Sequence, residues 1–127
     1  MNVNETISVI QIRNVLLVTM PADPDDSTIA ALQERTLEAM NNRDVQGLVL
    51  DLSKVEILDS YFARTVAETA QMVGLMGGTT IIAGMRPAVA ITATELGVTL
   101  GRTRTVMTVE RALELAGQRQ VNGKQQR

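Results

Sequence analysis

The sequence contains no histidine and no cysteine, and these two absences exclude most familiar catalytic and metal sites. A Ser–His–Asp triad, a Cys–His pair, histidine acid–base chemistry and a Cys/His zinc site all need residues that this chain lacks. Catalysis by carboxylates alone would need converging acidic side chains, and the acidic residues here are scattered along presumed helix faces. We therefore predict a protein that is not an enzyme and that uses neither a metal nor a cofactor.

Positive charge, aromatic side chains and long apolar runs are also scarce. The 12 basic and 14 acidic residues give a net charge of −2, and the aromatic residues are one Tyr and one Phe. Nucleic-acid binding is not expected, because it needs a basic patch or a stacking platform. No apolar run approaches the ~20 residues of a membrane span, and the first residues lack the basic-then-apolar pattern of a signal peptide. With no cysteine for disulfides, we expect a cytoplasmic protein without a membrane segment.

The apolar pattern predicts a single domain of the α/β class. A chain of 127 residues with 45% hydrophobic content is long enough for one core and too short for two. The element order β-β-α-β-α-β-α-β-α implies helices packed on a mixed β-sheet. The domain is predicted to span residues 1–117, with a polar C-terminal tail at 118–127. The strands are expected at 7–12, 15–20, 47–52, 79–83 and 103–107, and the helices are expected to begin near residues 26, 60, 87 and 109 and to end near residues 42, 77, 97 and 117.

The most informative stretch is the apolar strand 47–52 and the short link that leads from it to Asp59 and Ser60, where a helical pattern begins. The start of a helix carries unpaired N–H groups and a partial positive charge, so a phosphate added to a hydroxyl there is accommodated. Asp and Ser are also ordinary N-cap residues, and capping alone explains either of them. Tyr61 and Phe62 follow, and neighbouring helical residues point about 100° apart. One of the two is therefore expected in the core and the other at the surface.

Five short motifs resemble those of the STAS domain, the fold shared by bacterial anti-sigma-factor antagonists and by the cytoplasmic domains of sulfate transporters. The resemblance runs over roughly residues 5–117 and is closest to the stressosome branch of the family. It implies a single STAS domain. The motifs are Asp51-Leu-Ser-Lys-Val, Asp59-Ser60, Leu75-Met-Gly-Gly, Ala83-Gly-Met-Arg86-Pro87-Ala and Glu95-Leu-Gly97-Val.

The resemblance implies a non-enzymatic stressosome scaffold that sequesters a serine/threonine switch kinase and releases it when Ser60 is phosphorylated. Asp59, Ser60 and Tyr61 are the expected partner-binding residues. The further partners it implies are a paralogous STAS sensor protein in a large assembly and a second copy of the chain, as a dimer or higher oligomer. Thr92 matches the spacing of a second phosphorylation position, with Thr94 nearby, although a threonine bonded to its own helix backbone explains either.

Three alternative interpretations compete with this one. A phospho-Asp receiver domain would carry a lysine after its last strand, and neither Lys54 nor Lys124 lies there. A nucleotide-binding fold would carry GxxxxGK[ST] or GxGxxG, and both are absent. A direct anti-sigma-factor antagonist that binds an anti-sigma kinase remains the alternative function, although Tyr61-Phe62 replaces the small residue and glycine of that branch. Arg86, before a proline, either is only solvated or lines the same face as Ser60.

Overall fold

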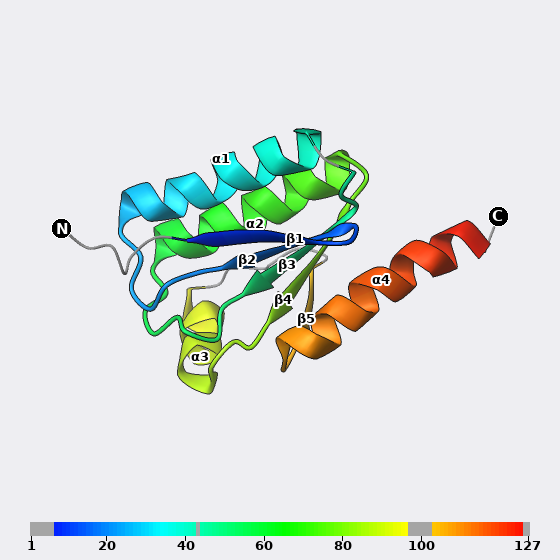
Figure 1. Cartoon of the computed structure of the whole chain (residues 1–127). Helices are drawn as coiled ribbons and strands as arrows, with labels where there is room; N and C mark the ends of the chain where they lie inside the picture. Colours follow the sequence, from blue (N-terminus) through cyan, green and yellow to red (C-terminus); the bar gives the residue numbers. More distant parts are fainter. Residues whose placement is uncertain (1–6, 43, 97–102, 126–127) are drawn as a thin grey trace.

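Within residues 7–42, 44–96 and 103–125, which the computed structural model describes, five strands form one sheet (Figure 1). The strands lie side by side in the order of the chain: β1 (Ser8–Ile12), β2 (Val15–Thr19), β3 (Gly47–Asp51), β4 (Thr79–Ala83) and β5 (Arg104–Val106). Strand β1 is antiparallel to β2, and the pairs β2–β3, β3–β4 and β4–β5 are parallel. The predicted element order and the predicted mixed sheet are confirmed.

Helices cover both faces of the sheet. Helices α1 (Asp26–Asn42) and α2 (Ser60–Leu75) lie together on one face, and α4 (Val109–Gln125) lies on the other, as Figure 1 shows. Successive side chains of a strand point to opposite faces, so Leu48 and Leu50 of β3 pack in the larger core cluster while Val49 packs in the smaller one with Ala112. Strand β3 is therefore a central strand buried on both sides, as its apolar run predicts.

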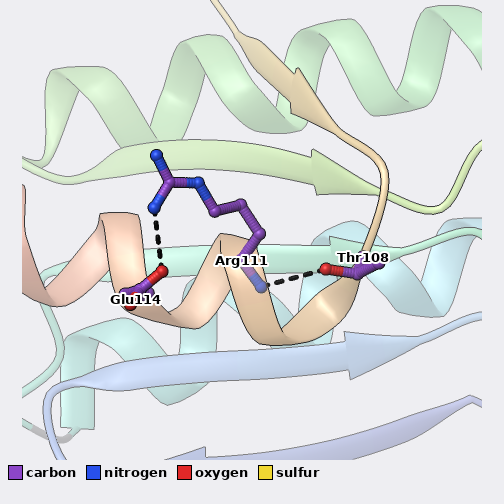
Figure 2. A network of polar contacts seen from close by, with 3 residues as sticks. All are labelled: Thr108, Arg111 and Glu114. Carbon is purple, nitrogen blue, oxygen red and sulfur yellow. Dashed lines mark hydrogen bonds and ion pairs between the residues drawn. The ribbon is translucent and has the colours of Figure 1, made fainter.

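Polar side chains fix the starts of α1 and α4 at the predicted places. Asp25 accepts hydrogen bonds from the Thr28 backbone N–H at 2.9 Å and from the Ser27 hydroxyl at 3.0 Å, which caps α1. These hydrogen bonds hold the pKa of Asp25 below its ordinary value, and the bond from the Thr28 backbone N–H has the largest effect. Thr108 caps α4 by accepting from the Arg111 backbone N–H at 3.1 Å, and Arg111 also pairs with Glu114 at 2.8 Å (Figure 2).

The predicted end of the last helix at Gly117 is wrong. Helix α4 continues to Gln125, through most of the segment expected to be a polar tail. Most residues from 118 to 125 are Gln, Arg or Lys, whose unbranched side chains favour helices, and this preference outweighs the cost of the glycines at 117 and 123. Helix α3 (Pro87–Glu95) begins at its predicted proline, and its predicted stop at Gly97 lies outside the described residues.

Candidate functional site at the start of helix α2

The link between β3 and α2, residues 52–59, is hereafter the β3–α2 loop. Three of its side chains are anchored in the core, since Leu52 and Val55 are buried and Leu58 is 8% exposed. Its backbone is tied to a neighbouring loop by the N–H of Glu56, which donates to the Ala22 carbonyl at 2.8 Å. Between these anchors Ile57 is 54% exposed. The loop is therefore fixed from beneath and presents its outer side to solvent.

Asp59 is the residue that caps α2. Its backbone is extended, with φ −107° and ψ −179°, and its Oδ1 accepts a hydrogen bond from the Phe62 backbone N–H at 2.8 Å. Of the two candidate cap residues, Asp59 fills the role and Ser60 becomes the first residue of the helix. Ser60 is exposed. Its hydroxyl is therefore placed at the positive end of a helix dipole without being needed to cap that helix.

The two aromatic residues separate as predicted. Phe62 is 1% exposed and belongs to the larger core cluster, whereas Tyr61 is 38% exposed. Neighbouring residues of a helix point about 100° apart, so Phe62 points into the core while Tyr61, next to Ser60 in the sequence, stays at the surface. The partner-binding residues predicted from the sequence, Asp59, Ser60 and Tyr61, are thus all exposed at one helix start.

Arg86 reaches this region from the start of α3. Its Nε donates to the Ser53 carbonyl oxygen at 3.0 Å, and its Nη1 lies 3.9 Å from a Glu56 carboxylate oxygen. The sequence predicts that Arg86 either is only solvated or lines the same face as Ser60. Neither interpretation includes a bond to the β3–α2 loop. Arg86 and Ser53 are 33 positions apart, so no local sequence pattern predicts their contact.

Thr92 and Thr94 bond to their own helix. The Thr92 hydroxyl donates to the Ala88 carbonyl and the Thr94 hydroxyl to the Ala90 carbonyl, each at 3.1 Å. The backbone-bonding interpretation of both residues is confirmed. A second phosphorylation position at Thr92 stays a prediction.

The described part of the chain offers no group of three or more Cys, His, Asp or Glu side chains arranged to hold a metal ion. In the same residues, no helix is both long and apolar enough to cross a membrane. The chemistry that the site offers is that of its exposed hydroxyl and its charges.

Replacing Asp59 by Ala is expected to lower the free energy of unfolding by about 0.5–2 kcal/mol, because it removes the side-chain cap of α2. Replacing it by Asn should cost less, since Asn caps helices about as well. Urea denaturation of both variants measures the difference. If both variants have the wild-type midpoint, the bond from the Phe62 N–H contributes nothing to stability.

The sheet order and the helices on its two faces define an α/β domain, and the family follows from comparison with known proteins. Residues 6–112 match the STAS domain family, and the chain belongs to it. The STAS fold predicted from the sequence motifs is confirmed.

Its curated relatives include RsbT co-antagonist proteins of Bacillus subtilis. The chain is 30% identical over 86 residues to the RsbT co-antagonist protein RsbRB of Bacillus subtilis (strain 168), covering 68% of this chain and 31% of RsbRB. It is 23% identical over 103 residues to RsbRA of the same organism, covering 81% of this chain and 38% of RsbRA. The chain thus spans about a third of the length of these curated relatives.

Solved structures agree. A variant of RsbS from Moorella thermoacetica superposes with a TM-score of 0.78 and 25% identity, over 88% of this chain and 95% of that one. The unphosphorylated anti-sigma factor antagonist SpoIIAA superposes with a TM-score of 0.71 and 15% identity, over 93% and 97% of the two chains, which shows the shared fold. Within the stressosome branch the sequence motifs predict a resemblance to RsbS, and the superposition confirms it. These relatives support a regulatory role.

Proposed function

We propose that this chain is a stressosome scaffold protein that holds a serine/threonine switch kinase and releases it when Ser60 is phosphorylated. The observation that carries the proposal is that Asp59 caps α2, so that the neighbouring Ser60 is exposed and its hydroxyl is not needed for the cap. Similarity to an RsbS structure over 95% of that chain supports the scaffold role.

Phosphate at Ser60 suits the helix and opposes a docked partner. It brings about −1.5 to −2 charges to a position next to Asp59. The helix tolerates this charge, because its first turn carries unpaired N–H groups. A kinase docked over Ser60 and the exposed Tyr61 would instead meet repulsion and a desolvation cost. A change of about 1–3 kcal/mol would weaken binding 5- to 150-fold, which is enough for a switch.

The partners in the proposal are the kinase, a paralogous STAS sensor protein and further copies of this chain. Similarity to the RsbT co-antagonist proteins supports assembly with such a paralogue. The second candidate function, a direct anti-sigma-factor antagonist, is favoured by the fold shared with SpoIIAA. Size-exclusion chromatography with light scattering separates the two, since the scaffold forms a large assembly, alone or with the paralogue, and the antagonist stays a free monomer or dimer.

The test of the proposal is to incubate the purified protein with its cognate kinase and ATP and to map the phosphate by mass spectrometry. Phosphate is expected at Ser60, together with dissociation of the kinase on a native gel or sizing column. Phosphate found mainly at another residue would sink the assignment.

Replacing Ser60 by Asp is expected to weaken kinase binding partially, because one carboxylate carries about half the charge of a phosphate and lacks its third oxygen. Stability should hold or rise slightly, since an acidic residue in the first turn is favourable. Ser60→Asn is the matched control, with a similar shape and no charge. Titrations at low and high salt should show a weakening by Asp that salt reduces. Equal binding by the Asp, Asn and wild-type proteins at both salt levels would mean that charge is not the signal.

A further inference from the structure

We propose that Arg86 is a positioning residue for Ser60: it holds the outer side of the β3–α2 loop and thereby keeps Ser60 in the arrangement that the kinase recognises. The kinetic consequence rests on the proposed function, whereas the effect on the loop does not. The starting observation is the 3.0 Å hydrogen bond from Arg86 Nε to the Ser53 carbonyl oxygen.

The backbone from which Arg86 reaches the loop is well fixed. Arg86 is the N-cap residue of α3, with φ −71° and ψ 149°, and Pro87 follows it at the first helical position. The residue before a proline is confined to extended conformations, and the Arg86 carbonyl also accepts from the Ala90 N–H at 2.9 Å. The backbone of Arg86 is therefore held in one conformation, and this fixes the point from which its guanidinium extends.

The segments on either side of this contact lie against each other. At Gly84, where φ is +75°, an added Cβ would come within 2.9 Å of the Ser53 Cβ, so the two backbones meet where only glycine fits. The Gly84 N–H in turn donates to the Val106 carbonyl at 3.0 Å. Arg86 thus joins the β3–α2 loop to the end of β4, and a Glu56 carboxylate oxygen lies 3.9 Å from Nη1 of the same guanidinium.

The contact is suited to positioning and poorly suited to stabilising the fold. The side chains of Arg86 and Glu56 are 49% and 60% exposed, and exposed ion pairs contribute little to stability. A hydrogen bond from a planar guanidinium to a backbone carbonyl does restrict where that peptide lies. Phosphoryl transfer depends on placing the attacking hydroxyl, so a loop with more freedom is a poorer substrate even when the domain is fully folded.

The test compares Arg86→Ala with the wild type and with Arg35→Ala, which removes an exposed arginine from the middle of α1. Steady-state phosphorylation of Ser60 should show KM raised about three- to tenfold in Arg86→Ala with kcat nearly unchanged, because only the fraction of molecules with an ordered loop binds productively. Amide hydrogen exchange should quicken in the β3–α2 loop alone, with a melting temperature close to that of the wild type. Arg86→Lys should fall between the two, since it keeps the charge without the guanidinium.

Several results would overturn the inference. One is that Ser60 is phosphorylated in both proteins and Arg86→Ala has the KM of the wild type. This result would contradict the role of Arg86 and leave the proposed function intact. Another is faster exchange throughout the domain with a large fall in melting temperature, which would make Arg86 a general support of the fold. If the wild type takes no phosphate at Ser60, the proposed function fails, and the exchange experiment still decides whether Arg86 positions the loop: unchanged loop exchange in Arg86→Ala contradicts it.

Discussion

Replacing Ser60 by Ala is expected to abolish phosphate incorporation at the start of α2 and to leave the kinase bound in the presence of ATP. The fold should be unaffected, because Asp59 and not Ser60 provides the cap of the helix. Alanine is the best helix former, so the free energy of unfolding should stay within about 0.5 kcal/mol of the wild type. Phosphorylation assays with mass spectrometry, and kinase retention on a sizing column, give the two readouts.

Ser53→Ala is the matched control for this variant. Ser53 is an exposed serine of the β3–α2 loop, and it contacts Arg86 through its backbone carbonyl, which alanine retains. The control should therefore be phosphorylated and should release the kinase like the wild type. Equal phosphate in Ser60→Ala and the wild type would show that the switch lies elsewhere.

Replacing Phe62 by Ala should produce the largest loss of stability, about 3–5 kcal/mol, because it leaves a cavity in the core as well as removing buried apolar surface. Phe62 is 1% exposed and packs in the cluster that joins α1 and α2 to the sheet. Domains of this kind are stable by only about 5–15 kcal/mol in total, so the variant approaches the limit of folding. Urea denaturation followed by circular dichroism measures the change.

Tyr61→Ala is the neighbouring control, and its comparison separates the roles of the two rings. Tyr61 is 38% exposed, so its removal should change the unfolding midpoint little. Its effect should fall on kinase binding, where aromatic side chains are frequent anchors. Equal destabilisation by the two substitutions would contradict the division between a buried and an exposed ring.

Most of the fold could be predicted because its signals are local. Apolar runs located the strands, and polar residues such as Asp25 and Thr108 marked the helix starts that the structure confirms. The end of α4 differs from its prediction, because a glycine in a polar segment is a typical helix stop, whereas the residues that follow Gly117 favour a helix. Stop signals are weaker than start signals when good helix formers continue beyond them.

The site was predictable only in part, for a related reason. An Asp-Ser pair after a buried strand locates a helix start, and two adjacent aromatic residues on a helix must face different ways. Contacts between distant segments leave no such trace. The bond from Gln33 Nε2 to the Thr69 hydroxyl at 3.2 Å joins α1 to α2 across 36 positions of the sequence. Arg86 and Ser53 belong to the same class, because their meeting depends on how β3 and β4 lie side by side.

The strand order also bears on how the protein is made. Each strand pairs with the strand that precedes it in the chain, so the sheet can grow from one edge as the polypeptide leaves the ribosome, starting from the β1–β2 hairpin. The β1–β2 hairpin is the local pairing, whereas the parallel pairs join residues further apart in the chain, such as Val15 and Gly47, and form more slowly. The helix that covers the second face, α4, is synthesised last, and until it arrives Val49 and Ile81 remain uncovered. The nascent domain is therefore most exposed to aggregation before α4 is made, and a ribosome stalled after β4 would present an apolar surface that the complete domain hides.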